Sequence, residues 1–477
     1  MKPDRSTVWL DDALAVTEPA DLLPERRSGE EGRLRLPLRV RAALPLSVHL
    51  RSDSTWLLLM SDVEDALIAA PVVRAGAGLR RAQPGDGAAE DLLRVLSINP
   101  DPGPDFALIP MHPRTAAGER AIGSDQTHDS VVVGELAVVK WTVHAAAPAS
   151  DVPAIDAIRH LAATGFTEVP EPVGFVTASP GGGPESVLMA SASGFLPGAL
   201  DGWDWCVADA LAWLEASSGP NEIDAQNAGP PDSSAPAHLG GLVARMHAAF
   251  ATPWAEVPEP VSMSTHDDRR HWHRRAAAAL DEAVAVTDGL PGERLRMRVE
   301  PARRILASLS EGAATPMTRI HGDLHVGQML RWSGSITETG QREPYNVVVS
   351  DFDGNPVLPP HERAEPGPPA RDVAGMLRSL DHVGRIVDRR TSYAASAMVE
   401  AWIAGARTDF LSSYRSELAA HRMNHLFDAT LIAPYEVEQE CRELLYASRH
   451  LPRWTYVPDA ALRALIPMPE PSSGDRE

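Results

Sequence analysis

The sequence predicts an α+β protein in which a β-rich N-terminal part precedes a helical C-terminal part. Three observations lead to this fold class. Up to about residue 198, short apolar runs alternate with turn residues, a pattern typical of strands. From about residue 199 onward, apolar residues recur with helical spacing. The chain has 477 residues, and because one hydrophobic core rarely grows beyond roughly 250–300 residues, we expect two or three domains.

Shifts in composition along the chain suggest the domain boundaries. Two strands around a Gly-Glu turn are predicted over residues 120–143, and a helix over 151–164, with Asp151 at its N-cap and Pro153 in its first turn. A polar, proline-rich stretch at 218–236 predicts a loop. The expected segments are a mostly β cap domain over residues 1–112, a β-rich lobe with one helix over 113–198, a helical lobe over 199–467 and a disordered tail over 468–477.

The composition argues against several classes of partner. The formal net charge is −21, whereas binding to nucleic acid or to an anionic membrane surface needs a basic footprint. No apolar run approaches the roughly 18 residues of a membrane span, and the N-terminus lacks a secretory signal pattern. Cys206 and Cys441 provide neither a disulfide framework nor a zinc-finger spacing. We therefore expect a cytoplasmic protein that acts on a small molecule as a monomer or small homo-oligomer.

Two acidic clusters carry the strongest functional signal. The stretch RIHGDLHVGQML spans residues 319–330, and VVVSDFDGNP spans residues 347–356. Asp323 and Gln328 lie in a loop between apolar flanks, and Asp351 follows a strand-like run. A kinase-type site needs one carboxylate at the acceptor hydroxyl and oxygen ligands for Mg²⁺. The spacing therefore indicates Asp323 as the catalytic base, with Asp351 and Gln328 as Mg²⁺ ligands.

One lysine also stands out. The chain has 44 basic residues, of which only Lys2 and Lys140 are lysines. Lys140 lies in the strand-like stretch VVVGELAVVKWTV, and its ammonium is a compact point charge that an arginine does not replace. We expect Lys140 to hold the phosphates of ATP, paired by Asp156 on the following helix.

Other phosphate and metal motifs fit less well. The chain contains no G-x-x-x-x-G-K-[ST] pattern, and no G-x-G-x-x-G follows a strand. His321 and His325 have the spacing of a helical zinc site. However, Gly322 and Gly327 break a helix at this point, and the glutamate of the zinc motif is missing.

Together, these motifs resemble the aminoglycoside phosphotransferase-like kinases, and more closely their maltokinase-type branch. The resemblance implies a bilobal protein-kinase-like fold with an N-terminal cap domain, ATP and Mg²⁺ as cofactors, and a small sugar as acceptor. His321, His325 and Asp353 are expected to support the site. The matching stretches are SVVVGELAVVKW, SGFLPGALDGWDW, LGGLVARMHAAF, IHGDLHVGQML, VVSDFDGNP, RDVAGMLRSLDH and ELLYASRHLPRWTYVP, within residues 115–458.

The chain departs from this branch at two places. Where maltokinase-type sequences carry Phe-Glu-Gly-Glu-Pro after the metal aspartate, this chain has Phe-Asp-Gly-Asn-Pro at residues 352–356. The change reduces the local negative charge. The loop GSDQTHDS, expected to cover ATP, has one glycine. Phosphate contacts are therefore expected from the side chains of Ser124, Thr127 and Ser130.

The stretch PYEVEQECRELLYASRHLPRW, residues 434–454, suggests the acceptor. On a helical wheel, Glu436, Gln439 and Glu440 share one face with Glu443. Carboxylates in an acceptor pocket suit a cationic sugar, and Trp454 could stack on its apolar face. The stretch is similar to that of actinobacterial glucosamine kinases, which implies phosphorylation of glucosamine to glucosamine 6-phosphate. The alternative is a solvated acidic face beside a core tryptophan.

Other assignments stay open. Asp372, in ARDVAGML, is either an acid favoured at a helix N-terminus or a substrate contact. The sequence also allows a maltokinase that makes maltose 1-phosphate, a kinase of aminoglycosides, or a pseudokinase that serves as a binding module.

Overall fold

The computed structural model describes residues 5–23, 37–47, 55–122, 129–143, 152–181, 183, 185–217, 235–332, 346–355, 358, 360–363 and 365–468. The chain forms two compact units. Unit 1 comprises Met1–Ile158, Val169–Gly198 and Pro356–Ala364, and unit 2 comprises Arg159–Glu168, Ala199–Asn355 and Glu365–Glu477. Among the helices in these described ranges, none is both long and apolar enough to cross a membrane.

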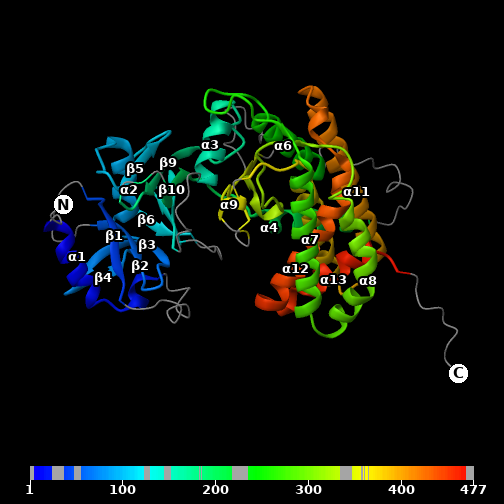
Figure 1. The fold of residues 1–477 in the computed structure, drawn as a ribbon, viewed down its shortest axis with the longest axis horizontal. Coiled ribbons are helices and arrows are strands. Elements are labelled where there is room, and N and C mark those ends of the chain that lie inside the picture. Colours follow the sequence, from blue (N-terminus) through cyan, green and yellow to red (C-terminus); the bar gives the residue numbers. More distant parts are fainter. Residues whose placement is uncertain are drawn as a thin grey trace. The chain divides into compact units, whose positions relative to one another are not determined.

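Unit 1 is built on two antiparallel sheets, shown in blue and cyan in Figure 1, with strand orders β1-β2-β3-β4 and β5-β9-β10-β8-β7-β6. The strands of the first sheet are β1 (Arg39–Pro45), β2 (Thr55–Ser61), β3 (Leu67–Ala75) and β4 (Gly78–Arg81). Those of the second are β5 (Phe106–Pro110), β6 (Glu119–Ala121), β7 (Asp129–Val133), β8 (Ala137–Trp141), β9 (Pro172–Ala178) and β10 (Val187–Gly194). The helices that begin in this unit are α1 (Arg5–Ala15), the 3-10 turn η1 (Pro19–Leu22), α2 (Ala88–Ile98), α3 (Pro153–Ala163) and α9 (Pro360–Arg363).

One hydrophobic core joins the two sheets of unit 1. It includes Leu57 from the first sheet, Leu93 from α2, and Trp141 and Val176 from the second sheet. The apolar runs of β2 and β9 are buried along their whole length, as expected for strands covered on both faces. The predicted boundary at residue 112 falls within this unit, and the division into a cap domain and a lobe stays a prediction.

Unit 2 is mainly helical. Its α-helices are α4 (Gly202–Ser217), α6 (Ala235–Phe250), α7 (His266–Val286), α8 (Gly289–Ala307), α10 (Ala370–Arg390), α11 (Ser396–Ala420), α12 (Ile432–His450) and α13 (Tyr456–Leu465). Its 3-10 turns are η4 (Val326–Gln328), η5 (Asn424–Leu426), η6 (Ala429–Leu431) and η7 (Pro452–Trp454). Its strands pair antiparallel, β11 (Ser262–Met263) with β12 (Pro316–Met317) and β13 (Met329–Trp332) with β14 (Asn346–Val349).

Helix α12 lies at the centre of the packing in unit 2, where it contacts α7, α8, α10 and α13 (Figure 1). Val437, Cys441 and Leu444 form a buried apolar stripe on this helix and belong to the core shared with α7 and α8. Helix α7 begins with a capping box, in which Thr265 and Asp268 satisfy each other's backbone N–H groups.

Several predicted elements are confirmed. Strands β7 and β8 form the hairpin predicted for 120–143, and Gly134 and Glu135 at its turn have φ angles of 58° and 54°. Helix α3 occupies the stretch predicted over 151–164, although its proposed N-cap residue Asp151 lies outside the described residues. Most of the loop predicted at 218–236 also lies outside them, and α6 begins at Ala235.

Candidate active site

The site is organised around residues 319–330, called here the site loop. Asp372, in the first turn of α10, accepts hydrogen bonds from the backbone N–H of His321 at 2.7 Å and of Gly322 at 2.9 Å. Its side chain also contacts His247 Nε2 at 3.1 Å, and His247 Nδ1 contacts the Tyr414 hydroxyl at 2.8 Å. Burial alone raises the pKa of Asp372, but the hydrogen bond and charge of His247 outweigh it, and the pKa is lowered. An ionised carboxylate therefore ties the loop to α10, α6 and α11.

Two glycines let helices approach the site loop closely. A Cβ on Gly202, at the start of α4, would lie 1.6 Å from the carbonyl oxygen of Val326. A Cβ on Gly375, in α10, would lie 2.4 Å from the carbonyl oxygen of Leu324. Both contacts are with backbone atoms, which cannot rotate away, so any larger residue would displace the loop or the helix.

Asp323, the predicted base, lies in a mostly buried and acidic environment. Asn355 Nδ2 donates a hydrogen bond to its Oδ1 at 3.0 Å. Burial raises the pKa of Asp323 to about 7, and the negative charges of Asp351 and Glu443 add to this effect. A carboxyl with this pKa can accept and release a proton near neutral pH.

Asp351 and Gln328 lie on adjoining parts of the same hairpin. Strands β13 and β14 pair, and the N–H of Ser350, just before Asp351, donates to the Gln328 carbonyl at 2.9 Å. Asp351 has a φ of 67°, in the left-handed region that a non-glycine residue enters at a cost of roughly 1–2 kcal/mol. Such strain is often retained at functional sites. One carboxylate and one amide oxygen, completed by phosphate oxygens and water, make a donor set that Mg²⁺ accepts, so the chemistry of these residues fits the predicted ion.

The two histidines of the loop have structural contacts. His321 Nε2 lies 2.9 Å from the carbonyl oxygen of Ser350, so this ring links the site loop to the turn that carries Asp351. His325 Nδ1 accepts a hydrogen bond from the Gly327 N–H at 3.0 Å, and its Nε2 lies 3.4 Å from Gln328 Nε2. Desolvation lowers the pKa of His325 to about 4, so the ring is neutral at physiological pH.

An aromatic wall borders His325. Trp203 stacks on the His325 ring with a centroid distance of 6.1 Å and an interplanar angle of 27°. Trp454 meets Trp203 edge-on at 6.3 Å, and both indoles are only partly buried. Trp205, by contrast, is 1% exposed and its Nε1 donates to the Met329 carbonyl, so it packs in the core.

The acids predicted on α12 have internal partners. Glu436 is 2% exposed and receives hydrogen bonds from Arg378 at 2.9 Å and Arg407 at 2.5 Å. Glu440 is fully buried, and its oxygens lie 3.0 and 3.2 Å from His382 Nε2. The face is therefore not a solvated one. Because their oxygens are occupied, the predicted contact of Glu436 and Glu440 with the substrate stays a prediction that these contacts do not support.

A different acid of α12, Glu443, lies within electrostatic reach of Asp323. Glu443 is partly exposed, receives a hydrogen bond from Gln439 Nε2 at 3.3 Å, and is close enough to Asp323 to raise the pKa of that carboxyl. The helical wheel placed Glu443 on the same face as Glu440. Only the packing shows that Glu440 is buried against His382, whereas Glu443 is partly exposed. Among the α12 acids, Glu443 is therefore the one best placed to meet an acceptor.

The residues predicted to bind ATP belong to unit 1 or lie outside the described residues. Lys140 in β8 is paired in register with Ser130 of β7, so the two residues are neighbours across the strands. Asp156 lies in the first turn of α3. Ser124 and Thr127 lie outside the described residues. Asp353, in unit 2, is partly exposed in the turn after Asp351. The roles assigned to these residues stay predictions.

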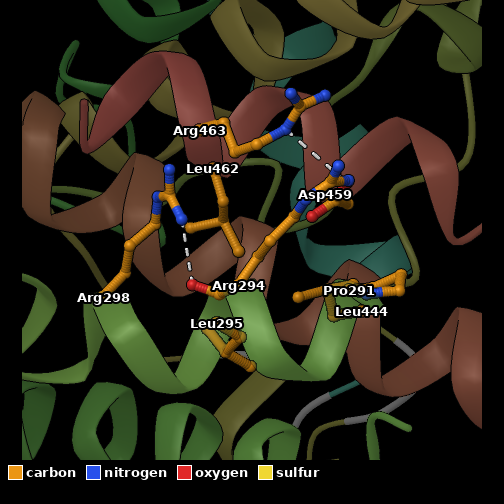
Figure 2. Close-up of a pocket in the computed structure, with 8 residues that line it drawn as sticks. All are labelled: Pro291, Arg294, Leu295, Arg298, Leu444, Asp459, Leu462 and Arg463. Carbon is orange, nitrogen blue, oxygen red and sulfur yellow. Dashed lines mark hydrogen bonds and ion pairs between the residues drawn. The ribbon is translucent and has the colours of Figure 1, made fainter. Parts of the chain in front are cut away.

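One further crevice lies away from this site, among α8, α12 and α13 (Figure 2). Leu295, Leu444 and Leu462 are among its lining residues. An ion pair of 2.7 Å between Arg294 and Asp459 crosses it. None of the candidate site residues lines this crevice, so we do not assign the acceptor to it.

Comparison with known proteins places this arrangement in context. No family model matches the chain. A curated glucosamine kinase from Streptacidiphilus jiangxiensis is 43% identical over 464 residues, covering 95% of this chain and 97% of the relative. The glucosamine kinase of Mycolicibacterium smegmatis is 38% identical over 413 residues, with coverage of 86% and 95%.

Solved structures agree with these relatives. A structure described as glucosamine kinase in crystal form B has a TM-score of 0.78 and 41% identity, with coverage of 96% of this chain and 99% of its own. One described as glucosamine kinase in complex with glucosamine, ADP and inorganic phosphate has a TM-score of 0.75 and 40% identity, with coverage of 98% and 100%. The likeness confirms the predicted α+β, kinase-like fold class.

Proposed function

The chain belongs to the glucosamine kinases, and on that premise we propose that it transfers the γ-phosphoryl group of ATP to glucosamine, on the primary hydroxyl. The products are glucosamine 6-phosphate and ADP. The observation that carries the proposal is the environment of Asp323. This carboxyl is held by Asn355, and burial, helped by the charges of Asp351 and Glu443, raises its pKa to about 7.

Asp323 orients the acceptor hydroxyl and takes its proton as the phosphoryl group is transferred. Its oxygen Oδ1 is held by the Asn355 amide, and the backbone of the preceding two residues is held by Asp372. This double anchorage fixes the direction in which the carboxylate faces. Positioning of this kind supplies much of the catalysis in phosphoryl transfer, because the transition state is loose and mainly needs alignment and charge stabilisation.

Mg²⁺ would neutralise and align the phosphates of ATP when bound, with Asp351 and Gln328 as the residues that would hold it. Lys140, with Asp156 and Ser130, is proposed to contact the phosphates from unit 1. An ATP-using kinase of this kind is proposed to act in the cytoplasm, and the monomeric or small homo-oligomeric state stays a prediction.

The amino group of the acceptor is proposed to meet Glu443. The support is that Glu443 is partly exposed, has Gln439 as a hydrogen-bond neighbour, and lies within electrostatic reach of Asp323. Trp454 and Trp203 border the same loop and offer apolar faces to a sugar ring. A carboxylate built to pair with an ammonium would reject the hydroxyl analogue, since its charge would be left poorly paired.

A sugar panel with purified protein and Mg-ATP tests the proposal, with glucosamine, glucose, maltose and an aminoglycoside compared at matched concentrations. Glucosamine should have the highest kcat/KM. In Glu443→Gln, kcat/KM for glucosamine should fall roughly 10- to 100-fold, the loss of one charged hydrogen bond, while that for glucose changes little. Glu282→Gln, which removes an exposed acid on α7, serves as the control. Preferential use of maltose, or equal loss on both sugars, would contradict the assignment.

A further inference from the structure

A second charged cluster lies in unit 2, outside the catalytic residues described above. It is formed by α7, α12 and the first turn of α10. Glu438 of α12 is 3% exposed and receives hydrogen bonds from Arg275 Nε at 2.9 Å and from Arg442 NH2 at 2.9 Å. Tyr435 and Arg442 lie on the same face of α12 as Glu438, and Tyr435 packs against Trp272 of α7.

Two polar groups of this cluster lack hydrogen-bond partners among the described residues. The Tyr435 hydroxyl is buried and makes no hydrogen bond with any residue that the structure describes. The guanidinium of Arg371 makes no hydrogen bond or ion pair with any residue in the part of the chain that the structure describes, and it is only partly exposed. Arg371 and Tyr435 are electrostatic neighbours of each other and of Arg275 and Glu438. Unpaired groups that gather at one place are a costly arrangement unless something binds there.

The balance of charge favours an anion as the missing partner. Burial and the nearby Arg275 lower the pKa of Arg371 to about 10, because they outweigh the opposing effect of Glu438, so the guanidinium is still charged but only partly compensated. Its position in the first turn of α10 is also unfavourable for a cation, because the helix dipole favours negative charge there. Neither local pairing nor helix stability therefore accounts for this arginine.

We propose that Arg371, Arg275, Arg442 and the Tyr435 hydroxyl form a binding site for a phosphate group, either free inorganic phosphate or the phosphate of a sugar phosphate. Guanidinium groups present paired N–H donors that match phosphate oxygens, and the tyrosine hydroxyl adds a neutral donor. Glu438 keeps Arg275 and Arg442 in place and leaves Arg371 available. The site adjoins the acceptor side, since the charge of Arg371 reaches Asp323, but it contains none of the residues proposed to bind ATP or glucosamine.

Calorimetric titration of the full chain with inorganic phosphate tests the site directly. The titration is run with a saturating non-hydrolysable ATP analogue and Mg²⁺, so that the nucleotide's own phosphate positions are filled, and at constant ionic strength with chloride as the reference anion. One further phosphate should bind to the wild type. Arg371→Gln should weaken this binding roughly 10- to 100-fold, and Tyr435→Phe should weaken it severalfold.

Two features make the test independent of folding defects and of the sugar assignment. Tyr435→Phe removes a hydroxyl that has no hydrogen-bond partner among the described residues, so the variant should fold normally, and only its phosphate-dependent gain in thermal midpoint should shrink. Arg303→Gln, an exposed arginine paired with Asp281, should titrate like the wild type. A parallel titration with glucosamine 6-phosphate, judged by the part of its binding that Arg371→Gln removes, identifies the source: tighter binding than inorganic phosphate assigns the site to a sugar phosphate, and equal or weaker binding assigns it to free phosphate. Absence of binding for both ligands, or unchanged binding in Arg371→Gln, would overturn the proposal.

Discussion

Replacing Asp323 by asparagine should stabilise the protein while it abolishes turnover. The folded environment raises the pKa of Asp323 from 3.8 to about 7, mainly through burial. Above pH 7 the carboxyl is ionised in both the folded and the unfolded chain, and its ionisation costs folding free energy. Below about pH 4 it is protonated in both states and costs nothing. The penalty therefore grows as pH rises between these values.

The size of the effect follows from the shift. About three pKa units at roughly 1.36 kcal/mol each correspond to about 4 kcal/mol as the largest expected gain, reduced by the partial exposure of the carboxyl. Asparagine keeps the shape and can still accept the hydrogen bond from Asn355. The gain should thus approach its full value at pH 8 and vanish near pH 4.

Urea unfolding of the wild type and of Asp323→Asn, at several pH values between 4 and 8, measures this directly. The midpoint of the variant should exceed that of the wild type by a margin that widens with pH. Asp267→Asn, which alters a side chain that is 81% exposed, should follow the wild type throughout. A pH-independent difference, or a variant that is less stable at pH 8, would refute the reasoning about the environment of Asp323.

Three other changes have expected outcomes. Asp372→Asn, at a buried carboxylate that holds the site loop, should destabilise the protein by about 3–5 kcal/mol and lower kcat. An unchanged urea midpoint would show that the hydrogen bonds of Asp372 to the loop do not stabilise the fold. Asn355→Ala removes the donor to Asp323 and should move the acidic limb of the kcat/KM profile up by about 1–2 pH units, which a profile from pH 5 to 9 would detect or exclude. Lys140→Met should reduce kcat/KM for ATP by roughly 100-fold and leave the KM for glucosamine nearly unchanged; a glucosamine effect of the same size would place Lys140 elsewhere.

The sequence was informative where function depends on residue type at short spacing. Asp323 and Gln328 are five positions apart, and their chemistry could be inferred from the loop in which they lie. The apolar stripe of α12 could also be predicted, because helical periodicity is a local property. The hairpin of β7 and β8 was predictable for the same reason, since its turn is formed by two adjacent residues, Gly134 and Glu135.

Assignments that depend on partners far along the chain were not predictable in this way. Glu440 and Glu443 share one face of α12, yet Glu440 is buried against His382 of α10, while Glu443 remains partly exposed near Asp323. Asp372 was left between two roles, because its three hydrogen-bond donors come from residues 51, 50 and 125 positions away in sequence.

The sequence by itself determined the class of chemistry, because the acids, the amide and the lone lysine of a kinase site are recognisable by type and order. The tertiary structure alone decided how those groups are tuned. Burial and neighbouring charges from α10, α12 and the β14 turn set the pKa of Asp323, and helix packing decided which acids and arginines of unit 2 pair with each other. Arg371 looked like an ordinary residue beside Asp372. That its guanidinium has no hydrogen-bond or ion-pair partner within the described ranges emerged only from the fold, because pairing depends on distances between helices that sequence spacing does not contain.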